Sequence, residues 1–237
     1  YTNEEIVTRD YLLSGEVDCI INILDATNIE RNLYLTLQLI ELQIPMVLAI
    51  NMMDEMKTNG GTIKINRFKE MIGVDCIPIS AVKNEGISDL VNCVIQVAKQ
   101  KKQPARLDFC SGAVHRCIHG ISTMIEDHAQ QIHMPARFAA SKLIEGDKPL
   151  EKQLKLTDNE IDLIEHSVKE MECECDMDRE AAMADMRYTF IEKLCKDTVI
   201  RAHESKEYLR SVKIDAVLTS KYFAIPSFIL IMAAVFY

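Results

Sequence analysis

The sequence predicts an α/β fold: part of a doubly wound parallel sheet, followed by an all-helical domain and a C-terminal apolar helix. In the first hundred residues, three apolar runs of strand length alternate with segments of helical spacing. This order is typical of a parallel sheet with right-handed crossovers. The apolar runs show little polar alternation, as strands buried on both faces do. Beyond residue 106 no strand pattern appears, so we expect a domain boundary there.

The first elements follow from capping patterns and apolar periodicity. Thr2-x-x-Glu5 is a capping box that opens a helix to about residue 13. Thr27-x-x-Glu30 opens a second helix to about residue 43, whose leucines lie on more than one face, so we expect it to be packed on both sides. The predicted strands are residues 17–24, 46–50 and 76–81, and the other predicted helices are residues 65–72 and 87–101.

The second half of the chain has helical spacing throughout. Residues 99–106 are polar, contain a proline and are typical of a linker. After them we expect a helix near residues 114–132, a short helix after Pro135, one capped by Thr157-x-x-Glu160, and a long one over about 178–209. The predicted domains are therefore an α/β domain over 1–104, a helical domain over 105–211 and a juxtamembrane segment over 212–237.

Polar residues follow two of the predicted strands, where open α/β sheets bind ligands. Asn51-x-x-Asp54 ends one strand, and Ser80-Ala81 ends the next one along the chain. The Asp54 carboxylate can accept hydrogen bonds from the N1–H and 2-amino group of guanine, which adenine lacks. Asn-x-x-Asp alone is equally consistent with a strand end and an Asx turn. The two motifs together, each on its own strand end, favour guanine recognition.

Longer segments resemble a known family. Residues 1–13, 25–42, 51–55, 137–147, 186–191 and 213–219 are similar to the bacterial ferrous iron transport protein B (FeoB) family. The resemblance implies a P-loop-type GTPase domain that binds GTP or GDP, with Mg²⁺ in the intact protein, and a helical domain that relays the nucleotide state to a membrane region moving Fe²⁺. It implies that Asn51, Asp54, Ser80 and Ala81 contact or support guanine. Met52 departs from the lysine that many GTPases have there, yet its thioether can lie over a purine.

The motifs for phosphate chemistry are missing. The sequence has no Gly-x-x-x-x-Gly-Lys-Ser/Thr loop and no Asp-x-x-Gly switch, both of which phosphoryl transfer in this class needs. We therefore expect a piece of the G domain without its first strands, assign no catalytic residue, and expect no GTP hydrolysis by this chain alone. The alternative is a degenerate α/β domain with a helical interaction module that binds no nucleotide.

Charge and hydropathy indicate the compartment. A net charge of −9 argues against nucleic acid as a partner, and eight cysteines without framework spacing indicate reduced thiols.

Basic residues collect over 187–221, just before the uncharged residues 222–237. Sixteen residues reach only ~24 Å of a ~30 Å hydrocarbon core, which suits a buried helix. The basic excess and Tyr222 and Phe223 favour the start of a membrane helix, with residues 1–221 cytoplasmic at the inner (plasma) membrane. A homo-oligomer is possible.

Two clusters invite a metal interpretation. His115-x-Cys117-x-His119 places two histidines on one helical face, but Cys117 would point elsewhere and no fourth ligand is apparent. Cys173 and Cys175 lie in an acidic stretch that is more simply a polar turn at a helix end. The sequence therefore predicts no metal site.

Overall fold

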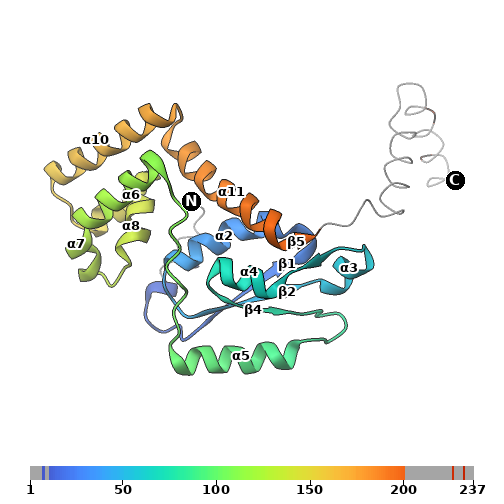
Figure 1. Cartoon of the computed structure of the whole chain (residues 1–237). Helices are drawn as coiled ribbons and strands as arrows, with labels where there is room; N and C mark the ends of the chain where they lie inside the picture. The colour runs from blue at the N-terminus through green and yellow to red at the C-terminus, as the bar shows by residue number, and fades with distance from the viewer. Residues whose placement is uncertain (1–6, 9–10, 201–225, 227–231, 233–237) are drawn as a thin grey trace.

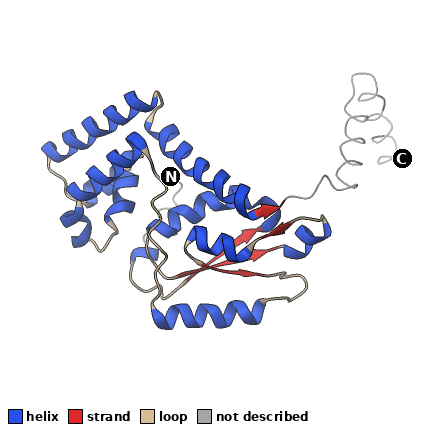
Figure 2. Ribbon diagram, in the orientation of Figure 1, coloured by secondary structure: helices blue, strands red, loops and turns tan. Residues whose placement is uncertain are grey.

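The protein, represented by a computed structural model, is described here over residues 7–8, 11–200, 226 and 232. Its main sheet has three parallel strands in the order β1-β2-β4 (Figures 1 and 2). The strands are β1 (Ile20–Asp25), β2 (Met46–Asn51) and β4 (Asp75–Pro78). Five of the six residues of the central strand β2 are buried, as expected for a strand covered on both faces.

Helices cover the two faces of this sheet. The helices α2 (Ile29–Glu41) and α4 (Ile65–Ile72) lie on one face, and α5 (Ile87–Gln100) lies on the other (Figure 1). Leu33, Leu37 and Phe68 pack with the strands on the first face, whereas Leu90 and Val97 pack against Val47 and Ala49 on the second. The predicted partial doubly wound sheet is confirmed over these residues.

Two predicted boundaries at the start of the sheet are wrong. The first strand was expected from residue 17, but pairing begins at Ile20, which donates its N–H to the Pro45 carbonyl 2.8 Å away. The neighbouring strand begins only at Met46, so earlier residues have no partner strand. Thr27 does not cap α2 either. Asp25 accepts hydrogen bonds from both the Thr27 N–H and its hydroxyl, and a short 3-10 helix η1 (Ala26–Asn28) precedes α2.

The helical part contains six helices among the described residues. Its apolar core includes Ile118, Ile121, Ala139, Ile144 and Val168. The helices are α6 (Gly112–Met124), α7 (Glu126–Gln131), α8 (Ala136–Ile144), α9 (Lys148–Gln153), α10 (Asp158–Cys175) and α11 (Arg179–Thr198). The capping box of Thr157 and Glu160 opens α10 as predicted. The single helix expected near 114–132 divides into α6 and α7, and α9 was not expected.

The last described element corrects the prediction of a strand-free second half. The long helix α11 ends at Thr198, not near residue 209. It is followed by β5 (Val199–Ile200), which pairs antiparallel with β3 (Thr62–Ile63) of the α/β part. The antiparallel pair ties the end of α11 to the segment between α3 (Met53–Thr58) and α4. A strand of two residues is too short to show the alternation of apolar and polar residues from which strands are predicted.

The helix α11 packs on both parts of the molecule (Figure 1). Ala182, Met183 and Met186 belong to the helical core, while Ile191 and Leu194 belong to the core beneath the sheet. Helix α2 is also packed on two sides, as expected, because it contacts both β1 and α8. The two parts therefore share a continuous packed boundary.

Charged side chains are buried at this boundary. Arg187 of α11 donates a 2.6 Å hydrogen bond to Glu145 and a 3.2 Å hydrogen bond to the Tyr34 hydroxyl. Its other terminal nitrogen lies 3.8 Å from the Glu41 carboxylate of α2. Burial raises the pKa of Glu41, and the nearby Arg187 and Arg137 offset this only in part. These groups link α2, α8 and α11 electrostatically.

The expected membrane segment, residues 222–237, lies almost wholly outside the described residues, as does the Thr2-x-x-Glu5 capping box. Within the part of the chain that the structure describes, no helix is both long enough and apolar enough to cross a bilayer.

Candidate guanine-nucleotide site

The candidate site forms where β2 and β4 end. The strands are parallel neighbours with Ile50 opposite Pro78, so the residues that follow them emerge at one edge of the sheet. Asn51 is the last residue of β2, and Asp54 lies in the first turn of α3. Ser80 and Ala81 come directly after β4 and Ile79. The two predicted motifs are thereby brought together.

Asn51 holds the two loops against each other. Its side-chain oxygen accepts a hydrogen bond of 3.1 Å from the Ala81 N–H. The backbone continues the pairing beyond the strands, since the Ile79 N–H donates to the Ile50 carbonyl and the Met53 N–H donates to the Ile79 carbonyl. The Asn51 amide thus joins the end of β2 to the loop after β4.

Asp54 lies between a hydroxyl and an ammonium group. A hydrogen bond from the Ser80 side chain, followed by backbone hydrogen bonds and the charge of Lys83, holds the pKa of Asp54 below its usual value. The Lys83 Nζ atom is 3.7 Å from an Asp54 carboxylate oxygen. Ser80 itself is buried, with 2% of its surface exposed. Asp54 is therefore ionised at neutral pH and presents a fixed acceptor.

The loop after β4 is closed by its own backbone. Ser80 and Glu85 exchange two hydrogen bonds of 3.1 and 3.0 Å, and the Ser80 hydroxyl accepts from the Lys83 N–H. Gly86 has φ of +74°, and a Cβ there would lie 2.4 Å from the Pro78 carbonyl oxygen. Only glycine fits that conformation and that contact. Sequence reasoning assigned no role to Lys83 or Gly86, although both follow Ser80-Ala81 closely.

Met52 caps the start of α3 in a left-handed conformation. Its φ is +61°, unusual for a residue other than glycine, and 37% of its surface is exposed. Backbone strain of this kind, about 1–3 kcal/mol, clusters at ligand sites. The exposed thioether next to Asp54 is free to contact a planar ligand.

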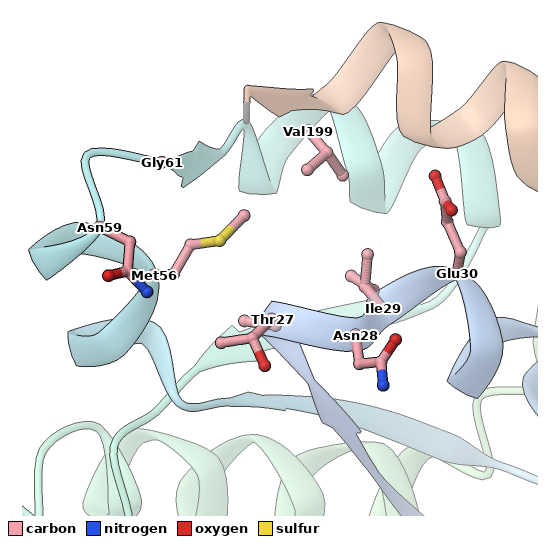
Figure 3. A pocket seen from close by; sticks show the side chains of 9 residues that line it. Thr27, Asn28, Ile29, Glu30, Met56, Asn59, Gly61 and Val199 are labelled. Carbon is pink, nitrogen blue, oxygen red and sulfur yellow. The ribbon is translucent and has the colours of Figure 1, made fainter. Parts of the chain in front are cut away.

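A separate hollow lies near the end of β1. It has a volume of about 230 Å³ and lies between η1, the start of α2, α3 and β5. Figure 3 shows Met56 on α3 and Asn59 directly after this helix at one side of it, Thr27 and Ile29 at another, and Val199 opposite them. None of Asn51, Met52, Asp54, Ser80 and Ala81 lines it. This hollow is therefore distinct from the predicted base site.

Comparison with known proteins identifies the family. Residues 1–94 match the family model of ferrous iron transport protein B, and residues 111–200 match that of the FeoB cytosolic helical domain. The crystal structure of S. thermophilus NFeoB bound to GDP·AlF4⁻ and K⁺ is 35% identical, with a TM-score of 0.76 over 83% of this chain and 76% of that one. The chain belongs to the FeoB family. The resemblance seen in the sequence is confirmed.

Other FeoB proteins give the same result. NFeoB from S. thermophilus bound to mGMPPNP is 33% identical, with a TM-score of 0.74 over 87% of this chain and 76% of that one. The Fe(2+) transport protein A/Fe(2+) transporter FeoB fusion protein of Porphyromonas gingivalis is 29% identical over 100% of this chain. The Fe(2+) transporter FeoB of Legionella pneumophila is 28% identical over 99%. The chain spans only 29% and 30% of the lengths of these two relatives.

Proposed function

We propose that this chain is the cytoplasmic guanine-nucleotide-binding portion of a ferrous iron membrane transporter. The observation that carries the proposal is the convergence of Asp54, Ser80, Asn51 and Ala81 at one sheet edge. It is supported by the nucleotides GDP and mGMPPNP in the solved NFeoB relatives and by the transporter names of the longer ones.

Guanine is recognised by charge and hydrogen-bond pattern. The ionised Asp54 carboxylate accepts from guanine N1–H and the 2-amino group, while the Ser80 hydroxyl and Lys83 hold that carboxylate in place. The Ala81 N–H now donates to Asn51 and would be shared with guanine O6 in a three-centre hydrogen bond. Met52 covers one face of the purine. Adenine has no donors at these positions, so the carboxylate positions that face the base would stay unsatisfied, a cost of about 1–3 kcal/mol.

The phosphate-binding half of the site is supplied by other parts of the full-length protein. In the described structure β1 pairs with β2 only, and Ile21 and Ile23 are 47% and 61% exposed. Parallel strands are normally covered on both faces, so the exposed Ile21 and Ile23 suit a further covering element, while the second edge of β1 suits a further strand. The motifs that hold phosphate and Mg²⁺ are missing from this sequence, and we assign no Mg²⁺ ligand to its residues.

The nucleotide state reaches the membrane region through the helical domain, in the domain arrangement 1–104, 105–211 and 212–237. Helix α11 supports this path because it packs on both cores and ends beside β3. In this proposal residues 222–237 begin the first membrane helix, and the basic residues before them favour a cytoplasmic location for residues 1–221. The transported ion is Fe²⁺, as in the named relatives.

The test is a change of base preference in the intact protein. Asp54→Asn should weaken GDP binding roughly 10- to 150-fold. This range corresponds to the loss of one hydrogen bond to a charged group, which contributes about 1.5–3 kcal/mol. It should strengthen binding of xanthosine diphosphate, whose 2-oxo group accepts where guanine donates. The matched control is Glu55→Gln, which removes the adjacent exposed carboxylate of α3.

Competition titration with a fluorescent GDP analogue measures both preferences. Unchanged GDP preference in Asp54→Asn would refute the base assignment. If the intact protein binds neither nucleotide, the alternative of a degenerate α/β domain with a helical interaction module replaces the proposal.

A further inference from the structure

Four metal-ligating side chains meet where the linker enters the helical part. Asp108 and Cys110 belong to the segment between α5 and α6, and His115 and His119 lie one turn apart near the start of α6. The ligating atoms of all four lie within 4.8 Å of one another. The cluster is distinct from the guanine site.

The distances within the cluster suit a tetrahedral cation site. Cys110 Sγ lies 3.1 Å from Asp108 Oδ1 and 3.3 Å from His115 Nδ1. Asp108 Oδ1 lies 3.4 Å from His115 Nδ1 and 3.7 Å from His119 Nε2. Metal–ligand bonds of ~2.0–2.3 Å at tetrahedral angles separate ligand atoms by roughly 3.3–3.6 Å. Four separations within the cluster are therefore close to tetrahedral spacing, and the four ligand atoms all lie within 4.8 Å of one another.

The residues around the cluster fix its geometry. Cys110 is buried against the helical core, which holds its sulfur in place. The rings of His115 and His119 lie on one face of α6 with their centroids 4.2 Å apart and their planes tilted by 38°. Cys117 is buried in the core on another face of the same helix and is not part of the cluster. Besides the two histidines that the sequence singled out, the segment between α5 and α6 supplies two further candidate ligands, Asp108 and Cys110.

One cation already lies beside the cluster. Arg137 of α8 donates to Cys110 Sγ at 3.3 Å, and its Nη1 lies 3.2 Å from His119 Nε2. Its Nε atom is buried without a hydrogen-bond partner, 3.8 Å from the Glu41 carboxylate. A metal ion that binds the His119 lone pair would displace Arg137 from His119. Arg137 could then pair more closely with Glu41. The guanidinium can thus move aside without losing its counter-charge.

We propose that Asp108, Cys110, His115 and His119 form a binding site for a divalent first-row transition-metal ion. Sulfur and imidazole nitrogen favour Zn²⁺, Fe²⁺ or Co²⁺ over Mg²⁺ and Ca²⁺, which take oxygen ligands. Binding releases the Cys110 thiol proton to solvent and leaves a thiolate–metal bond, without any redox step. The two histidines and Asp108 are partly exposed, so an ion can enter from solvent.

Co²⁺ titration of the full 237-residue chain under anaerobic, reducing conditions tests the site. We expect one equivalent to bind with the intense d–d and thiolate-to-cobalt absorption of a tetrahedral site. Because losing even an outer-shell partner costs 10–100-fold in metal affinity, losing a direct ligand should cost on the order of 100-fold or more. Cys110→Ser and, separately, His119→Gln should therefore abolish or greatly weaken binding. Since His119 is exposed, its variant should keep the fold, which circular dichroism verifies.

Two control variants separate this site from other thiols. Cys117→Ser alters the buried neighbour on α6, and Cys173→Ser/Cys175→Ser alters the pair at the end of α10. Both should bind Co²⁺ as the unaltered chain does. Competition with Zn²⁺ and with Fe²⁺ then identifies the preferred ion. Absence of stoichiometric binding, or a charge-transfer band that survives Cys110→Ser, would overturn the proposal.

Discussion

Replacing Arg187 by methionine should destabilise the protein strongly. Only 1% of the Arg187 side chain and 16% of the Glu145 side chain are exposed, and they share a 2.6 Å hydrogen bond. The substitution keeps much of the apolar volume but leaves Glu145 and Glu41 without their guanidinium. Breaking a buried pair in this way costs about 3–5 kcal/mol. In a protein of this size that corresponds to a Tm lower by roughly 6–20 °C.

The same helix provides the control. Arg179 makes two hydrogen bonds of 2.9 Å to Glu165, but 23% and 36% of these side chains are exposed. Because water screens this pair, Arg179→Met should cost only about 1 kcal/mol. Urea unfolding followed by circular dichroism gives both free energies, provided that the urea dependence is unchanged between variants.

A double variant tests the contribution of one carboxylate. Glu145→Gln added to Arg187→Met removes one of the two carboxylates that lose the Arg187 guanidinium. Because Lys142 Nζ also lies 2.8 Å from the Glu145 carboxylate, the second change should recover only part of the lost stability. If Arg187→Met costs no more than Arg179→Met, the boundary charges do not stabilise the fold and the reasoning fails.

Two further predictions concern pH and catalysis. Burial alone would raise the pKa of Glu145, but Arg187 and Lys142 outweigh it and lower that pKa. The stabilisation that ionised Glu145 contributes is therefore complete above the pKa of glutamate in the unfolded chain, about 4.3. It is lost as the pH falls through the lower pKa of Glu145 in the folded protein. Unfolding free energies should thus differ between the unaltered chain and Glu145→Gln by a constant amount from about pH 6 to 8 and converge in acid. A constant difference down to the acid transition would contradict this. Separately, the 237-residue chain should release no phosphate from GTP above background. GTP turnover by this chain that the Asp54→Ala substitution abolishes would contradict the prediction.

The sequence predicts elements well where local chemistry acts alone. The helix at residues 65–72 has the predicted bounds because Gly73 ends it in a left-handed conformation. The same capping pattern succeeds at Thr157 and fails at Thr27. At Thr27 the nearby Asp25 carboxylate takes the Thr27 N–H and hydroxyl, so the chain first forms a 3-10 turn.

The sequence fails where partners come from distant segments. The β3–β5 pair joins residues more than 130 positions apart, and each strand is too short to carry a pattern. The metal cluster was missed for a related reason. Helical spacing identified His115 and His119, but their partners Asp108 and Cys110 come from the irregular segment between α5 and α6, whose path no periodicity describes. The guanine motifs, by contrast, follow two adjacent parallel strands, whose ends must meet.

The β3–β5 pair also offers the nucleotide a short route to the chain's C-terminal region. Asp54 lies in α3, α3 leads directly into β3, and β3 pairs with β5 at the end of α11. The Lys64 N–H donates to the Thr198 carbonyl at 2.8 Å and fastens the same junction. We infer that ordering of α3 by guanine stabilises β5 directly, in addition to any relay through the helical core, because β3 joins α3 to β5 through an antiparallel pair. If this coupling exists, amide hydrogen exchange at residues 198–200 should become slower when GDP binds to the intact protein. If exchange slows only within α6 to α10, the helical core alone carries the signal.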